Sequence, residues 1–114
     1  MATTDQALLD VIERIREPAR RAGFARERGG LVRGRAWAEL SGRLSDGSWC
    51  ELRLHHTDRE QKMQAGLLIY RPLAQGGRTE VVGDVTVPYH LNASEATAGI
   101  VDAATVWFEA LSSD

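Results

Sequence analysis

Three histidines and one cysteine are the residues of this sequence whose types best suit chemistry. His55 and His56 are adjacent in a segment with strand-like alternation, and neighbours on a strand point to opposite faces, so their rings cannot chelate one ion together. A zinc site would need one of them, His90 and carboxylates from elsewhere. Cys50 falls on the expected core face of its strand, where a thiol acts as a small hydrophobe. We therefore predict no metal site, no cofactor and no catalytic residue.

The glycine-rich segment 29–34 is the nearest approach to a phosphate-binding loop. It follows an expected helix and precedes an expected strand, which reverses the order that a dinucleotide-binding loop requires. The sequence also contains no Gly-x-Ser-x-Gly nucleophile elbow. We do not expect an enzyme, although an enzyme or small-ligand carrier with a pocket around Cys50 and Trp107 stays open as an alternative.

Arginine is concentrated in the first third of the chain. Eight arginines between residues 14 and 35 stand against Glu17 and Glu27, although the whole chain has a net charge of −2. Such a stretch can bind an anion or single-stranded nucleic acid, or it can be a solvated helix end and loop. The pI of about 5.9 counts against nucleic acid. The candidate anion-binding residues are Arg20, Arg21, Arg26, Arg28, Arg33 and Arg35.

Length and composition indicate one globular domain over residues 1–114. Of the 114 residues, 43% are apolar and 26% charged, which fits an ordinary globular protein. Of the 14 basic residues only Lys62 is a lysine, a bias typical of GC-rich bacterial genomes. No apolar run approaches the roughly 18 residues of a membrane span, and residues 1–10 lack the features of a signal peptide. We therefore expect a bacterial, cytoplasmic protein without a membrane segment.

Two amphipathic helices are expected, one near each end of the sequence. Leu8, Val11, Ile12 and Ile15 recur at helical spacing within residues 4–22. Pro18 should kink or restart this first helix, and Gly23 is a credible stop. The second helix covers about residues 93–111. Its apolar stripe consists of Ile100, Ala103, Trp107 and Leu111.

The residues between the helices alternate with a period of two, which predicts strands. A three-residue turn at 45–47, ending in glycine, sets Leu40 opposite Leu52 and Glu39 opposite Arg53. The expected fold is α+β: a four-stranded antiparallel meander with an N-terminal and a C-terminal helix packed on one face (α-β-β-β-β-α). The expected ranges are strands at about 35–44, 48–56, 63–71 and 78–87, and a basic, glycine-rich loop at 25–34.

The sheet face turned away from the helices is the strongest functional lead. By parity it carries Trp37, Glu39, Arg43, Trp49, Glu51, Arg53, His55, Leu68, Tyr70 and Val82. Tryptophan, tyrosine and arginine are typical anchors of protein interfaces, and they also stack on nucleobases. Alternatively, arginine stems cover the indoles, with Arg43 lying on Trp49. Glu39, Glu51 and Asp84 count against a polyanion.

The leading hypothesis is a non-enzymatic protein-interaction module, whose partner is another protein or a second copy in a homodimer. An anion or single-stranded nucleic-acid binder is the alternative, with nucleic acid disfavoured by the acidic composition. The candidate interaction residues are Trp37, Arg43, Trp49, Arg53, His55 and Tyr70.

Overall fold

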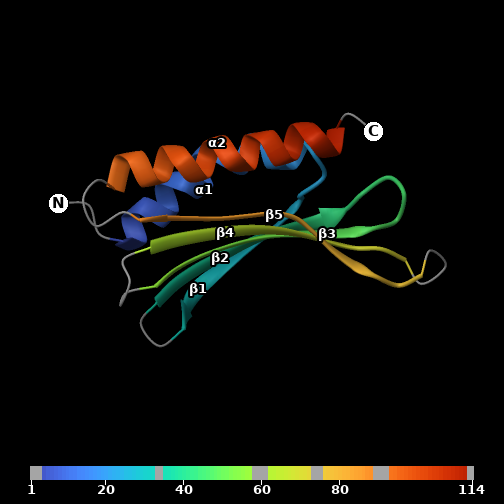
Figure 1. Ribbon diagram of the computed structural model, residues 1–114, viewed down its shortest axis with the longest axis horizontal. Coiled ribbons are helices and arrows are strands. Elements are labelled where there is room, and N and C mark those ends of the chain that lie inside the picture. Colours follow the sequence, from blue (N-terminus) through green and yellow to red (C-terminus); the bar gives the residue numbers. More distant parts are fainter. Residues whose placement is uncertain (1–3, 33–34, 58–61, 73–75, 89–92, 113–114) are drawn as a thin grey trace.

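Two helices lie on one face of an antiparallel sheet in the computed structural model of the chain (Figure 1). The structure describes residues 4–32, 35–57, 62–72, 76–88 and 93–112. Neither α1 nor α2 is apolar enough along its length to cross a membrane. The elements, in chain order, are α1 (Thr4–Arg21), β1 (Arg26–Val32), β2 (Arg35–Arg43), β3 (Trp49–Thr57), β4 (Lys62–Tyr70), β5 (Thr79–Pro88) and α2 (Ala93–Ser112).

The α+β class and the antiparallel sheet are confirmed, but the sheet has five strands and not four. The prediction of a loop over residues 25–34 is wrong, because Arg26–Val32 form strand β1 and pair with β2. β1 is an edge strand with β2 as its only neighbour. An edge strand does not need an apolar face, and charged residues there discourage pairing with other chains. Glycines and charges therefore produced a loop-like pattern in a segment that forms a strand.

α1 continues through Pro18 to Arg21 as a single helix. The chain then reverses at Gly23, whose φ of 109° is a conformation that favours glycine. The amide of Phe24 donates to the carbonyl of Ala19 at 2.9 Å. This turn folds Phe24 back onto the helix layer, where its ring centroid lies 5.3 Å from that of Phe108.

The register of the β2–β3 hairpin agrees with the prediction. Leu40 pairs with Leu52, and Glu39 pairs with Arg53. The amide of Leu44 donates to the carbonyl of Ser48 at 2.8 Å and closes the turn. Because side chains alternate along a strand, this register places the aliphatic residues of the hairpin on the side of the helices and its two tryptophans on the other side.

A β-bulge between β4 and β5 changes the expected parity of β5. Leu67 pairs with Gly83 and Leu68 pairs with Val81, so Val82 is an extra residue in β5. Val82 packs against the hydrophobic core, and the prediction that it lies on the opposite face is wrong. Val81 takes that place and is 66% exposed.

The core lies between the sheet and the helices. α1 contacts β2 and β3, α2 contacts β4 and β5, and the helices contact each other. This arrangement buries the inner face of the sheet and leaves the other face without a covering layer (Figure 1). The fully buried side chains include Val11, Ile15, Phe24, Leu40, Cys50, Leu52, Leu54, Met63, Leu67, Ile69 and Ile100.

Candidate functional site

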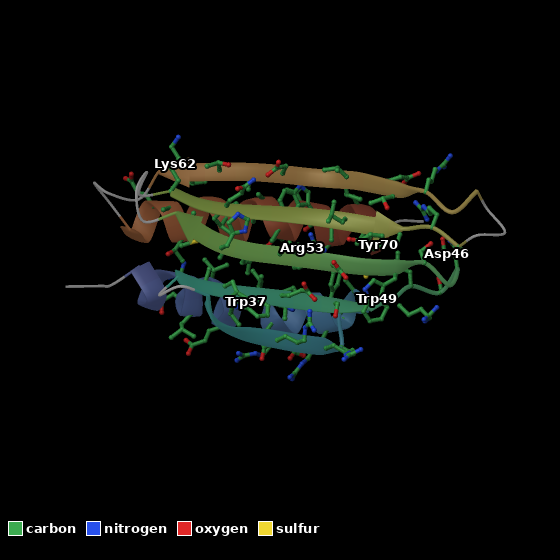
Figure 2. All side chains as sticks on the ribbon, turned by 90° about the horizontal axis from the view of Figure 1, so that it is seen from below. Trp37, Asp46, Trp49, Arg53, Lys62 and Tyr70 are labelled. Atoms are coloured by element: carbon green, nitrogen blue, oxygen red, sulfur yellow. The ribbon has the colours of Figure 1, made fainter. Side chains whose placement is uncertain are left out.

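The face of the sheet turned away from the helices carries the candidate site, and we name it the open face. Figure 2 is a view onto this face, with the helices behind the strands. All six candidate interaction residues lie on it, within β2, β3 and β4. The open face consists of Arg26, Arg28, Trp37, Glu39, Ser41, Arg43, Trp49, Glu51, Arg53, His55, Gln64, Gly66, Leu68, Tyr70, Val81 and Asp84.

Arginine side chains lie over both tryptophans of the open face. The guanidinium of Arg28 is 6.0 Å from the ring centroid of Trp37. Those of Arg26 and Arg43 are each 5.9 Å from Trp49. At these distances cation–π attraction contributes about 0.5–1 kcal/mol each where the groups are exposed. Both indoles are half-buried, and each has at least one arginine guanidinium over its ring.

The arginines of the predicted anion-binding stretch lie on two sides of the protein. Arg20 and Arg21 are in the last turn of α1, in the helix layer. Arg26 and Arg28 belong to β1 and join the aromatic side chains on the open face. Part of the predicted anion-binding stretch therefore lies on the same face as the predicted interaction residues. Outside the described part of the chain lie Arg33 and the side chain of Arg35.

Glu51 is the centre of a hydrogen-bond network on the open face. Its carboxylate accepts hydrogen bonds from the Trp49 indole at 3.0 Å, from Arg53 Nη2 at 2.7 Å and from the Tyr70 hydroxyl at 3.3 Å. Burial raises the pKa of Glu51, but the hydrogen bonds from Trp49 and Arg53, with the charge of Arg53, outweigh it and hold that pKa below its ordinary value. Glu51 is therefore an anion that organises an aromatic cluster.

Arg53 links the two glutamates of the open face. It lies 2.7 Å from Glu51 and 3.8 Å from Glu39, and its Nη2 donates to the Tyr70 hydroxyl at 3.1 Å. Glu39 also accepts a hydrogen bond from Arg28 at 3.0 Å. Burial, followed by the charge of Glu51, raises the pKa of Tyr70. Each glutamate is thus matched by an arginine.

A second polar chain crosses the open face between β3 and β5. His55 Nε2 and Gln64 Oε1 are 3.0 Å apart, and Gln64 donates to Asp84 at 3.2 Å. A shallow hollow of about 170 Å³ lies beside this chain, above Gly66, with Leu68 and Val81 on its wall. The hollow exists because Gly66 has no side chain between its larger neighbours.

The remaining candidate groups are Cys50 and the histidines. Cys50 is fully buried and its Sγ lies 3.3 Å from the Gly42 carbonyl; burial raises its pKa to about 11. Among the described residues, no three His, Cys, Asp or Glu side chains lie in a metal-binding arrangement. The predictions for His90 and for the side chain of His56 lie outside the described residues.

Cys50 and Trp107 are the residues named above for an expected pocket between the sheet and the helices. The ring of Trp107 lies against Gly83 of β5. A groove of about 420 Å³ runs between α1 and β1, lined by Leu8, Leu9 and Ile12 on one side and by Gly29 and Gly30 on the other. Its lining is mainly apolar.

An ion-pair cluster joins the two hairpin ends at one end of the sheet. Arg71 lies 2.9 Å from Asp46 in the β2–β3 turn and 3.2 Å from Glu80 in β5. A hydrogen bond from the Ser48 amide is the main reason that the pKa of Asp46 is lowered, and Arg71 adds to the effect. This cluster ties together two turns that are distant in sequence, a structural role.

The residues named for this face from the sequence did not include six of its members: Arg26, Arg28, Ser41, Gln64, Gly66 and Val81. Residues 26–30 are Arg-Glu-Arg-Gly-Gly. The arginines at every second position were the available indication of a strand. Comparison of the chain with protein-family models, with curated proteins and with solved structures finds no match to any of them.

Proposed function

We propose that this chain is a non-enzymatic protein-interaction module that binds its partner through the open face. The observation that carries the proposal is the pair of half-buried tryptophans, Trp37 and Trp49, on a sheet face without a covering layer. Large aromatic and arginine side chains supply most of the binding energy in protein interfaces. The network around Glu51 supports the proposal further, because it holds those side chains in place before a partner arrives.

The charge of the open face favours a protein partner over a polyanion. Its arginines alternate with the carboxylates of Glu39, Glu51 and Asp84, and Glu39 and Glu51 are paired with arginines. A nucleic-acid surface needs unpaired cations along a phosphate track. An anion or single-stranded nucleic-acid site is therefore the weaker candidate.

We also propose that the protein acts in a bacterial cytoplasm. Cys50 is a free, buried thiol, so the fold needs no disulfide and suits a reducing compartment. The strong preference for arginine over lysine supports a bacterial origin.

Two exposed valines provide a matched test of the proposed surface. Val81 lies on the open face and is 66% exposed, whereas Val106 lies on α2 and is 61% exposed. The tagged protein is used as bait in a lysate of the source cells, and captured proteins are identified by mass spectrometry. Val81→Glu should abolish capture, because it places a charge within an apolar contact, whereas Val106→Glu should not. Equal capture by both variants would refute the proposal.

The polyanion alternative has its own measurement. Binding of a fluorescent single-stranded RNA and DNA is followed at low salt, where phosphate contacts are strongest. We expect no binding by the wild-type chain. Binding that weakens steeply as salt is added would indicate that the partner is a nucleic acid and not a protein.

A further inference from the structure

We infer that the occupant of the open face is a second copy of this chain, docked face to face about a two-fold axis parallel to β3. The inference rests on the proposed function and names its partner. It follows from how the charges, the apolar groups and the hollow are distributed over the five strands.

The strand register arranges the open face in rows that cross all the strands. One row consists of Arg28, Glu39, Arg53, Gly66 and Asp84, in order from β1 to β5. The row therefore begins with a cation at one edge of the sheet and ends with an anion at the other. Both ends are exposed. Arg28 donates to Glu39 of its own copy at 3.0 Å but keeps 60% of its side chain exposed, and Asp84 accepts a hydrogen bond from neutral Gln64.

A two-fold rotation about an axis parallel to the strands keeps each row but reverses the order of the strands. β1 of one copy then faces β5 of the other, so Arg28 faces Asp84 of the second copy, twice in each dimer. A two-fold axis across the strands would instead place β1 over β1, with Arg26 and Arg28 against the same arginines. Like charges in contact are unfavourable, so charge complementarity selects the first axis.

The charges on the central strand, β3, are compatible with this arrangement. Arg53 lies close to the axis and would face its own counterpart. Its charge is balanced within each copy by Glu51 at 2.7 Å and Glu39 at 3.8 Å. The two central strands therefore meet as locally neutral surfaces.

The same rotation matches the shapes of the two faces. β2 of one copy lies over β4 of the other, so Trp37 meets the row that contains Gln64, at the margin of the hollow above Gly66. An isologous interface requires such self-complementarity, in which a projecting group and its recess are carried by the same chain. Leu68 and the exposed Val81 supply the apolar contact around the recess.

The area of the face is sufficient for a specific but weak dimer. Strands about 4.8 Å apart, with a rise of about 3.3 Å per residue, give a face of roughly 20 by 30 Å, or about 600 Å² per copy. The total of about 1,200 Å² is at the lower limit of standard interfaces. Buried area alone does not set the affinity, and we expect a dissociation constant on the order of micromolar, at the weak end of the range for interfaces of standard size.

Charge exchange between the two edges tests the pairing. The mass of the full chain is measured by sedimentation velocity from about 1 μM to about 500 μM, a range that extends from the expected constant to well above the tenfold weaker constants expected of the variants. Arg28→Asp and Asp84→Arg should each weaken the dimer at least about tenfold, because each creates two like-charge contacts. An equimolar mixture of the two variants should restore a dimer, and so should the double variant. Arg14→Asp, an exposed change on α1, is the matched control and should leave the wild-type constant.

Two results would overturn the inference. One is a monomer at every concentration; the other is a dimer that neither charge change weakens. Circular dichroism checks the fold. If Arg28→Asp unfolds the chain, Val81→Arg repeats the test, because Arg26 and Val81 are the two ends of one row and the rotation places residue 81 opposite Arg26 of the second copy. A monomeric chain whose capture of another protein is still lost in Val81→Glu would refute self-association and leave the proposed function standing.

Discussion

The indole of Trp107, on α2, lies directly on Gly83 of the edge strand β5, so that no side chain of β5 separates the ring from the strand backbone. A Cβ atom at position 83 would overlap the ring. Gly83 also pairs with Leu67 at the bulge that turns Val82 toward the core. The contact therefore links the position of α2 on the sheet to the direction of the β5 side chains, and so to the exposure of Val81 on the open face.

Gly83→Ala should destabilise the protein by about 1–3 kcal/mol, because the added methyl group must displace Trp107 from a packed position. The free energy of unfolding is measured in urea, and tryptophan fluorescence reports the displaced ring. Gly66→Ala is the control, since its Cβ would lie an ordinary 3.8 Å from the nearest atom. Equal stability of the two variants would contradict the packing described here.

Gly42→Ala should have a larger effect, about 3 kcal/mol or more, because its Cβ would overlap the backbone carbonyl of Gly23. A backbone carbonyl in a helix-ending turn cannot rotate away as a side chain can. Thermal unfolding by circular dichroism measures the loss. Gly30→Ala offers a comparison within the same sheet, because its nearest contact would be 3.6 Å; a melting temperature for Gly42→Ala at or above that of Gly30→Ala would be inconsistent with this close approach.

Glu51→Gln should reduce stability by about 1–2 kcal/mol at neutral pH, because charge-assisted hydrogen bonds become neutral ones. The folded pKa of Glu51 lies below its ordinary value of 4.5, so the unfolded chain takes up a proton first as the pH falls. The contribution of Glu51 is therefore complete above about pH 5 and is lost as the pH falls through the lowered folded pKa.

Urea unfolding at a series of pH values from 7 to 3 checks this dependence. We expect a shallower acid limb for Glu51→Gln than for the wild type. Glu109→Gln, an exposed change on α2, should leave the limb as it is. Parallel acid limbs for the wild type and Glu51→Gln would show that the network does not hold the carboxylate ionised.

Cys50 should be unreactive in the folded protein, because its side chain is fully buried and its pKa is raised to about 11. Labelling with a thiol reagent at pH 8 should be slower than in guanidinium chloride by a factor set by the unfolding equilibrium, about 10³ or more for a stable domain. Rapid labelling of the native chain would show that the space between sheet and helices is accessible, and would favour the ligand-pocket alternative.

Local patterns in the sequence determined most of the hairpin and helix structure. The alternation around Leu40 and Leu52, with a short turn that ends in glycine, allows one register that keeps apolar residues on one face. The structure has that register, with Glu39 opposite Arg53. The same parity argument predicts Trp37, Trp49 and Tyr70 together on one face, where the structure has them.

Tertiary structure alone decided the features that depend on neighbours distant in sequence. β1 has no apolar periodicity because an edge strand is held mainly by backbone hydrogen bonds, which any sequence except proline can make. Val82 and Val81 exchange faces because of a bulge next to Gly83, which lies beneath Trp107 in a contact between elements that local patterns do not encode. Both corrections bear on the open face: one brings Arg26 and Arg28 to the tryptophans, and the other brings Val81 to the hollow. The alternation of apolar and polar residues is a local property and can be read from the sequence. The strand that an edge strand pairs with, and the residue that a bulge leaves unpaired, are set by the packing of the whole chain.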